Sequence, residues 1–345
     1  MSKLSIQLVT WNGAKYIPYL FQSLRNQTYY DWELLVWDNH STDDTVARIR
    51  EATADFPVPV TIIEHTDNIG FAPAHNKLYQ KSSSEFIVLQ NQDMYLSSAC
   101  LAELIVGMER HPEAGSVTPR LMRWNFAVAQ EKGIENSLSN DIDAIGLKIF
   151  RNRRVIENFT KQSWDRVRTK LPADELEVFG VSGAFPLYRR SALESVAFAD
   201  CTFFDETYTS YKEDVDVAYR LQAAAYKAYV LLGSVVYHDR QGAGARELSD
   251  QAAAKNKQSQ SAYVIFHSYK NHLMTLYKNE YWQNFILDFP WILWYELKKL
   301  VYFLVFDRRV LSGLKEVFNK DLAKKRRLIK SFRKISWQEM RKWWV

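Results

Sequence analysis

Polar side chains that could hold a cation follow two predicted strands of this chain. Asp93 comes directly after the hydrophobic run 85–90, and His238 follows the apolar run 235–237. Hard divalent cations such as Mg²⁺ and Mn²⁺ prefer carboxylate, water and phosphate oxygens. One carboxylate, one histidine and the oxygens of a bound diphosphate would make an adequate cation site. Each residue alone also has a structural interpretation, as a capping aspartate or as a hydrogen-bonded core histidine.

A cluster of acids at 213–216 could supply a general base. Glu213, Asp214 and Asp216 open a predicted helix over 214–225. The helix dipole favours acids at this end, but three acids in four residues exceed what capping requires. Asp216 and Arg220 stand four residues apart, which predicts a surface or hinge ion pair. Glu213 and Asp214 have no such partner in the spacing and could therefore take part in catalysis. We expect Asp214 to remove a proton from a hydroxyl group.

Phosphate-binding motifs with other chemistries are missing from the sequence. Neither G-x-x-x-x-G-K-[ST] nor G-x-G-x-x-G occurs, and Gly70, Gly180 and Gly183 do not form part of one. Kinases, P-loop NTPases and dinucleotide-dependent oxidoreductases therefore become poor interpretations.

The first 120 residues must position these groups, and they alternate between strand and helix patterns. Predicted strands cover 4–10, 32–37, 60–64 and 85–90, with helices predicted over 14–26, 42–54 and 72–82. This order predicts a parallel sheet with right-handed crossovers, which binds ligands at the carboxyl ends of its strands. The residues expected at that edge are Thr10, Asp38, Asn68 and Asp93.

The region from 123 to 176 has no long apolar run, so we expect an elaborated loop region with short strands. Regular structure returns with the helix over 214–225 and a strand over 228–232. The segment 241–250 begins with a glycine-rich stretch that predicts a loop able to close over a ligand and exclude water.

Composition agrees with a folded chain of one or one and a half domains. The 345 residues are 47% hydrophobic and 25% charged. Cys100 and Cys201 form no metal or disulfide pattern, which favours reduced thiols in a cytosolic protein. The N-terminal residues lead straight into a strand pattern, so we expect no signal peptide.

The last hundred residues differ from the rest in character. The segment 281–306 is rich in aromatic residues but is interrupted by charges and by Pro290, so it does not predict a spanning helix. It favours an amphipathic helix or helix pair in a membrane interface, with a helical cap on the catalytic domain as the alternative. Residues 307–345 hold 13 Lys or Arg and 4 Asp or Glu, a net charge of +9, while the other 306 residues sum to −4. Such a tail suits an anionic membrane surface, and without a recognition motif it does not favour nucleic acid.

Together these segments resemble the family 2 inverting glycosyltransferases of GT-A fold, especially the rhamnosyltransferase-like branch, over roughly residues 4–240. The resemblance lies in Val9-Thr-Trp-Asn-Gly13, in 36–45, in 68–76, in Asn91-Gln-Asp93, in 180–190, in Phe204-Asp-Glu206 with Glu213-Asp214, and in His238.

The resemblance implies an α/β fold with a Rossmann-like mixed sheet flanked by helices. It implies a catalytic domain over 1–260, with a nucleotide-binding half (1–120) and an acceptor and catalytic half (121–260). A helical, membrane-associating extension would follow over 261–345.

The resemblance also implies roles for individual residues. Asp214 would be the base with Glu213 beside it, and Asp93 and His238 would bind Mg²⁺ or Mn²⁺. The nucleotide-sugar would contact Thr10, Asn12, Asp38, Asn68, Gly70, Asn76, Gln92, Gly183 and Ala184. Acceptor contacts are expected from 124–176, with Trp124, Asp143, Gly146 and Arg151 as candidates.

Some residues depart from the family pattern. Gln92 replaces the usual proline, Asn91 is a weaker ligand than aspartate, and Pro186 directly follows the Gly-Ala loop. His40 stands in the nucleotide loop where a smaller residue is usual. These departures bear on the substrate more than on the chemistry.

The expected activity is transfer of a sugar, most simply rhamnose from dTDP-rhamnose, to a hydroxyl of a polyprenyl-linked or growing saccharide. The enzyme would work peripherally on the inner face of the cytoplasmic membrane. UDP-galactofuranose and UDP-N-acetylhexosamine remain alternative donors. Two other classes stay open: a catalytically silent scaffold that binds sugar nucleotides or glycans, and a nucleotidyltransferase, for which Trp11-Asn-Gly-Ala-Lys15 is a poor phosphate loop. The sequence does not indicate an oligomeric state.

Overall fold

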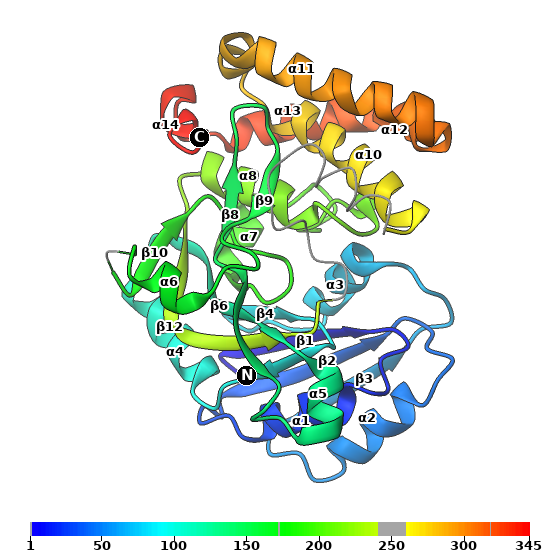
Figure 1. Ribbon diagram of the computed structural model, residues 1–345, viewed down its shortest axis with the longest axis vertical. Helices are drawn as coiled ribbons and strands as arrows, with labels where there is room; N and C mark the ends of the chain where they lie inside the picture. The colour runs from blue at the N-terminus through cyan, green and yellow to red at the C-terminus, as the bar shows by residue number, and fades with distance from the viewer. Residues whose placement is uncertain (1, 172, 241–259, 318) are drawn as a thin grey trace.

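The computed structural model describes residues 2–171, 173–240, 260–317 and 319–345 (Figure 1). A ten-stranded mixed sheet carries the order β10-β12-β6-β11-β4-β1-β2-β3, with β5 paired to β12 and β7 paired to β6. The segment 241–250, predicted to close over a ligand, lies outside the described residues, together with the rest of 241–259.

The N-terminal part of the sheet is parallel, as the strand and helix patterns predict. Its strands are β1 (Leu4–Thr10), β2 (Trp32–Asp38), β3 (Val60–Glu64) and β4 (Phe86–Gln90). The connecting helices are α1 (Ile17–Arg25), α2 (Thr45–Thr53) and α3 (Phe71–Tyr79). Every residue of β4 is buried because β4 lies between β1 and β11.

The second half makes the sheet mixed. Its members are β5 (Met94–Leu96), α4 (Cys100–Arg110), β6 (Ala114–Trp124), β10 (Glu175–Val178), β11 (Leu187–Arg189), α7 (Arg190–Ser195) and β12 (Lys227–His238). β11 runs antiparallel to both β4 and β6, whereas β12 runs parallel to β6. The predicted strand 228–232 ends too early: β12 continues to His238 through a register shift between Leu231 and Val235.

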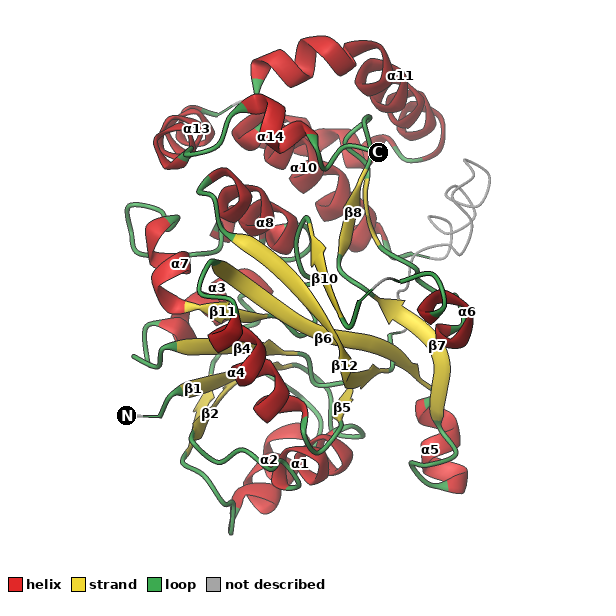
Figure 2. Cartoon of the chain, turned by 90° about the vertical axis from the view of Figure 1, so that its left-hand side faces the viewer, coloured by secondary structure: helices red, strands yellow, loops and turns green. Residues whose placement is uncertain are grey.

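The region predicted as loop with short strands contains more regular structure than expected. It holds α5 (Phe126–Lys132), β7 (Leu138–Ala144), a hairpin of β8 (Leu147–Ile149) and β9 (Val155–Glu157), and α6 (Trp164–Arg168). The β8–β9 hairpin leaves the sheet and reaches the C-terminal helices (Figure 2), where Ile149 bridges to Trp344.

The C-terminal helices form a layer at one end of the molecule, above the sheet in Figure 1. They follow a 3₁₀ turn η1 (Glu206–Tyr208) and the helix α8 (Glu213–Ala223), and comprise α10 (Ala262–Asn279), α11 (Trp282–Phe306), η2 (Arg308–Gly313), α12 (Leu314–Val317), α13 (Lys320–Phe332) and α14 (Trp337–Arg341). α10 packs against α8, α12 and α13.

The outward side of α11 is strongly apolar. At least 61% of the surface of each of its most exposed apolar residues is accessible: Trp282, Ile286, Trp294, Val305 and Phe306. Asp288, one of the charges that interrupts this segment, is instead buried and faces the hairpin. Within the described ranges no helix is both long and apolar enough to cross a membrane.

A buried cluster of charges joins α10 to η1 and α8. The ammonium of Lys278 lies 2.5 Å from Asp205 and 3.0 Å from Asp216, and none of these side chains is more than 1% exposed. Lys325 of α13 lies 2.8 Å from the other oxygen of Asp205. Asp216 and Arg220 pair at 3.0 Å, so the predicted surface or hinge pair is wrong about its surroundings: it is fully buried.

The cluster compensates the cost of burying its charges. Burial alone would raise the pKa of Asp205, but Lys278 and Lys325 lower that pKa well below its usual range. The pKa of Asp216 is lowered in the same way by Lys278 and Arg220, against the effect of burial. Breaking such a pair leaves an uncompensated charge in the interior.

We expect Lys278→Met to lower the free energy of unfolding by about 3–5 kcal/mol, because Asp205 and Asp216 would remain charged and buried. Urea unfolding at neutral pH measures the loss. Lys324→Met is the matched control, since Lys324 lies exposed on α13 and should change stability by less than about 0.5 kcal/mol. A loss no greater than the control's would contradict the assigned role of the cluster.

Candidate functional site

A cleft of about 1380 Å³ opens at the carboxyl ends of β1 and β4. The β8–β9 hairpin and the first turns of α10 also line it. The structure brings eleven of the predicted site residues to its walls: Thr10, Asn12, Asn68, Gly70, Gln92, Asp93, Gly183, Ala184, Glu213, Asp214 and His238.

The ends of β1 and β2 are joined by hydrogen bonds of Asp38. Its carboxylate accepts from Thr10 Oγ1 at 2.9 Å and from the Ser41 backbone at 2.8 Å. Asn12 adds a further connection between the loops after β1 and β2, since its side-chain oxygen accepts from the Thr42 backbone N–H at 2.8 Å. Asp38 is only 2% exposed and does not line the cleft, so it supports the predicted nucleotide loop from beneath.

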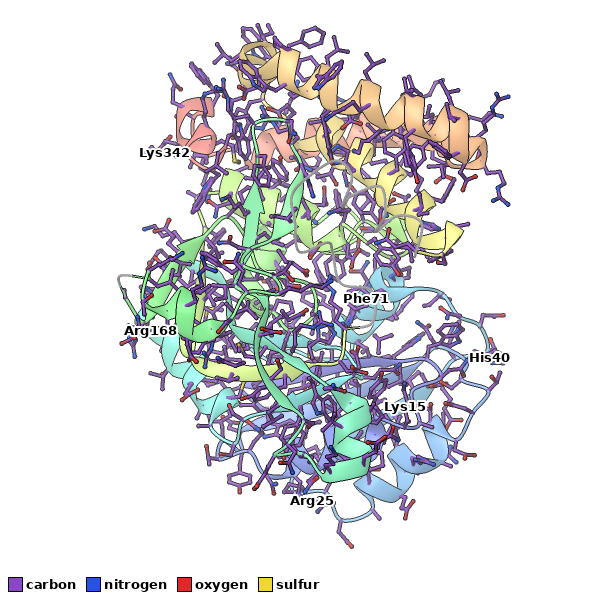
Figure 3. The ribbon with its side chains drawn as sticks, viewed as in Figure 1. Lys15, Arg25, His40, Phe71, Arg168 and Lys342 are labelled. Atoms are coloured by element: carbon purple, nitrogen blue, oxygen red, sulfur yellow. The ribbon has the colours of Figure 1, made fainter. Side chains whose placement is uncertain are left out.

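His40 has a backbone conformation in which glycine, which has no Cβ, would be relaxed. Its φ of +64° lies in the left-handed region, which side chains with a Cβ rarely adopt. Figure 3 shows His40 at the outer edge of the molecule, well apart from Phe71, which lines the cleft.

Gln92, which replaces the family's usual proline, pairs with the backbone of the opposite loop. Its side-chain oxygen accepts from Trp11 N at 3.0 Å, and its amide nitrogen donates to Trp11 O at 3.0 Å. A Cβ added at Gly13 would lie 2.2 Å from the Gln92 oxygen, so the pairing needs glycine there. This contact holds the loop after β1 against the loop that carries Asp93.

Asp93 and His238 face each other where β5 pairs with β12, because His238 pairs with Met94, the residue after Asp93. His238 Nε2 lies 3.3 Å from Asp93, and its Nδ1 lies 2.9 Å from Asp143, a buried carboxylate. Burial alone would lower the pKa of His238, but Asp93 and Asp143 outweigh it and raise that pKa to about 10. Asp143, predicted to contact the acceptor, is fully buried and orients the histidine.

These two residues suit a divalent cation that is shared with a ligand. Among the residues that the structure describes, no group of three or more His, Cys, Asp or Glu side chains could hold a metal ion. Mg²⁺ commonly uses one or two carboxylates and takes its other ligands from substrate phosphates and water. Asp93 with His238 fits that arrangement, because Asp143 binds Nδ1 and leaves Nε2 facing Asp93.

The backbone before α8 is held from two sides in an unusual conformation. Thr209, Tyr211 and Lys212 all have φ between +63° and +72°. On one side Gly70 packs so closely that a Cβ there would lie 2.5 Å from Thr209. On the other side Asn271 of α10 donates to the carbonyls of three residues in this segment, including Tyr211 at 2.7 Å. The acidic pair that follows is thereby fixed in place.

Asp214 and Glu213 differ in their surroundings. Asp214 accepts from the backbone N–H of Gly183 at 2.9 Å and of Val215 at 2.8 Å, and glycine at 183 permits this approach. Glu213 is 8% exposed, and its Oε2 has no hydrogen-bond partner among the described residues. Burial, reinforced by the charge of Asp214, raises the pKa of Glu213 to about 8.

Four other predicted residues do not reach the cleft, and one of them, Gly146, packs against Val178. Asn76 is buried and ties α3 to Phe204 through two hydrogen bonds of 3.0 Å. Trp124 is 2% exposed and packs among aromatic rings, including that of Tyr16. Arg151 points to α11, where it pairs with Asp288 at 3.0 Å.

Sequence reasoning did not identify several residues that line the cleft. They are Lys148, Arg154 and Glu157 of the hairpin, Tyr211 and Lys212 before α8, Tyr263 of α10 and Arg240 after β12. The hairpin's alternating pattern is only three residues long per strand, and no motif links 263 to 212.

Comparison with known proteins agrees with this architecture. Residues 5–197 match Glycosyl transferase family 2. An N-acetylglucosaminyl-diphospho-decaprenol L-rhamnosyltransferase from Mycobacterium tuberculosis is 25% identical over 275 residues, which cover 76% of this chain and 83% of that protein.

Two solved structures are similar in fold at low sequence identity. GalNAc-T7 with UDP, GalNAc and Mn²⁺ aligns with a TM-score of 0.58 and 12% identity, over 81% of this chain and 48% of that chain. A mannosyltransferase from Pyrobaculum calidifontis in complex with GDP-Man and Mn²⁺ aligns with a TM-score of 0.52 and 14% identity. The alignment covers 96% of this chain and 85% of that chain. The expected GT-A fold is confirmed. Because the family match spans more than half of the chain, the protein belongs to glycosyl transferase family 2.

Proposed function

We propose that this glycosyltransferase moves a sugar from a nucleoside diphosphate donor to a hydroxyl of a lipid-linked saccharide, with inversion at the anomeric carbon. The observation that carries the proposal is the cleft itself, which has Asp93 and His238 on one wall and Glu213 and Asp214 on another. The first pair suits a cation-bound diphosphate, and the second suits removal of a proton from a hydroxyl.

The donor is proposed to be dTDP-rhamnose and the acceptor a polyprenyl-linked saccharide. The rhamnosyltransferase from Mycobacterium tuberculosis supports both, since its name specifies rhamnose and a decaprenol-linked acceptor. Thr10, Asn12, Asn68 and Gln92 would contact the nucleotide-sugar, because they lie together at the ends of β1 and β4 and beside Gly70. UDP-linked galactofuranose or N-acetylhexosamine would be the alternative donors.

Asp214 is proposed as the base. It takes the proton of the acceptor hydroxyl while that oxygen bonds to the anomeric carbon, and the bond from this carbon to the nucleoside diphosphate breaks on the opposite face. Asp93 and His238 would hold Mg²⁺ or Mn²⁺, which when bound neutralises charge on the leaving diphosphate. Glu213, kept protonated at neutral pH by burial, adds no second negative charge beside the base.

The C-terminal helices are proposed to rest on the inner face of the cytoplasmic membrane. The exposed apolar side of α11 ends at Phe306 and is followed at once by exposed Arg308 and Arg309. Apolar and aromatic side chains beside cations suit an interface of anionic lipid. A polyprenyl-linked acceptor would be present in the same layer.

Calorimetry with UDP, dTDP, GDP and Mn²⁺ tests the donor and cation sites. The wild-type protein should bind a pyrimidine nucleoside diphosphate only with Mn²⁺, and Asp93→Ala should lose that binding. Asp214→Asn should keep it while the transfer rate falls by about 10²–10⁴-fold, since only the proton acceptor is removed. Binding without any turnover in the wild type would favour a glycan-binding scaffold, and no nucleotide binding would contradict the donor site.

The raised pKa of Glu213 predicts a pH dependence of stability. Between the ordinary pKa of glutamic acid and about 8 the folded protein retains a proton that the unfolded chain releases, so stability falls as pH rises. The slope for one proton approaches about 1.4 kcal/mol per pH unit. Glu213→Gln should flatten this part of the profile, which urea unfolding from pH 5 to 9 would measure. Parallel profiles for the two proteins would contradict the assignment.

Val305→Asp tests the membrane surface. Val305 is 67% exposed on α11, and replacing it with a charge should weaken binding to vesicles of anionic phospholipid by at least about tenfold. Val106→Asp is the matched control, because Val106 is 50% exposed on α4 of the catalytic part. Co-sedimentation with vesicles measures both; equal binding by the two variants would reject α11 as the contact.

A further inference from the structure

The first helix of the C-terminal extension forms one wall of the cleft. Tyr263, Val264 and Ser268 of α10 line it, facing a second wall made by residues 154–160 of the β8–β9 hairpin region. The acidic pair at the start of α8 borders the same space. The extension therefore contributes to the catalytic cleft in addition to its outward apolar side.

Two tyrosines present exposed rings on this side of the cleft. Tyr211 is 39% exposed and Tyr263 is 49% exposed, and their ring centroids lie 6.5 Å apart. Tyr211 lines the same cleft as Glu213 and Asp214, where an acceptor hydroxyl would be activated. Large, half-exposed rings of this kind offer an apolar face to a sugar ring and a hydroxyl at the edge.

Two lysines on the same side have no carboxylate partner among the described residues. Lys212 donates to Val155 O at 3.5 Å, and Lys148 lies 5.5 Å from the ring of Phe150. Arg240, by contrast, is paired with Glu157. Half-buried ammonium groups at a cleft wall are suited to an anionic group of a ligand, such as a diphosphate.

Both walls lead to α11. α10 ends at Asn279, three residues before α11 begins, and the tip of the hairpin is fastened to α11 by Arg151. That guanidinium pairs with Asp288 and lies 4.1 Å from the ring of Trp291. The hairpin that lines the cleft is thus also attached to the helix that carries the exposed apolar side chains.

We propose that the acceptor lies between the hairpin and α10 with its sugar against Tyr211 and Tyr263, its diphosphate beside Lys212 and Lys148, and its lipid directed to α11. This inference rests on the proposed function, which it deepens by assigning a diphosphate-bearing acceptor to named residues. It separates the anion site of the acceptor from that of the donor, where Asp93 and His238 lie.

Two synthetic probes test the assignment by binding alone, without donor. Octyl N-acetylglucosaminyl diphosphate and octyl N-acetylglucosaminide differ only in the diphosphate. Calorimetry on the full chain should give the wild type at least about tenfold higher affinity for the charged probe, as expected for hydrogen bonds between charged groups. Lys212→Met should abolish this preference and Lys212→Arg should retain it.

Separate variants test the proposed contact of the sugar with the rings of Tyr211 and Tyr263. Tyr263→Ala should weaken both probes by a similar factor, whereas Tyr30→Ala, which removes a 62% exposed ring far along the chain from the cleft, should change neither. Affinity for the nucleoside diphosphate should be the same in all variants.

The outcomes separate this inference from the proposed function. Equal affinity of the wild type for the two probes, or no binding of either, overturns the inference even if the nucleotide binds. Loss of nucleotide affinity in Lys212→Met also overturns it, because that lysine would then belong to the donor site. Absence of nucleotide binding in the wild type would instead sink the proposed function.

Discussion

The position of the Lys278 ammonium between two buried carboxylates is the constraint on which the site geometry depends. Asp205 and Asp216 lie outside the C-terminal helices, and the ammonium compensates the cost of burying both of their charges. The interaction fixes α10 along α8. Once α10 is fixed, Asn271 holds the carbonyls of the segment that leads into Glu213. The orientation of the acidic pair therefore follows from an ion pair formed by a helix of the extension.

A similar dependence exists on the donor side. Gly70 and Thr209 come from different halves of the chain and touch at a distance that excludes any other side chain at 70. The loop that is proposed to contact the nucleotide-sugar thus packs directly on the segment that precedes the base. The proposed donor site and the proposed base would therefore depend on one small piece of backbone.

The residues that could be predicted from the sequence are those whose positions follow from strand periodicity. Thr10 and Asp93 follow apolar runs that only a buried parallel strand explains, so their meeting at one edge was predictable. The burial of Asp216 was not predictable. Spacing alone indicates its partner Arg220, but its burial also depends on Lys278, which lies 62 positions further along the chain.

The wall formed by the hairpin and α10 was least predictable for the same physical reason. Tyr263 reaches the cleft only because α10 packs across α8, and no local pattern encodes such packing. Arg151 was expected there because it belongs to a polar region, yet its partner Asp288 draws it to α11. In that helix the sequence indicated amphipathic character correctly but did not indicate that one of its acids points inward.

The pairing of Gln92 with the Trp11 backbone has a consequence for how this protein can change over time. A side chain at Gly13 would displace the Gln92 amide from the Trp11 backbone, so the pairing couples the two positions. If a shorter residue replaced Gln92 first, position 13 could then accept a side chain with a Cβ. If Gly13 were replaced first, the new Cβ would clash with the Gln92 amide. We expect homologous sequences to show correlated substitution at these two sites, with a glycine at the first wherever a glutamine occupies the second.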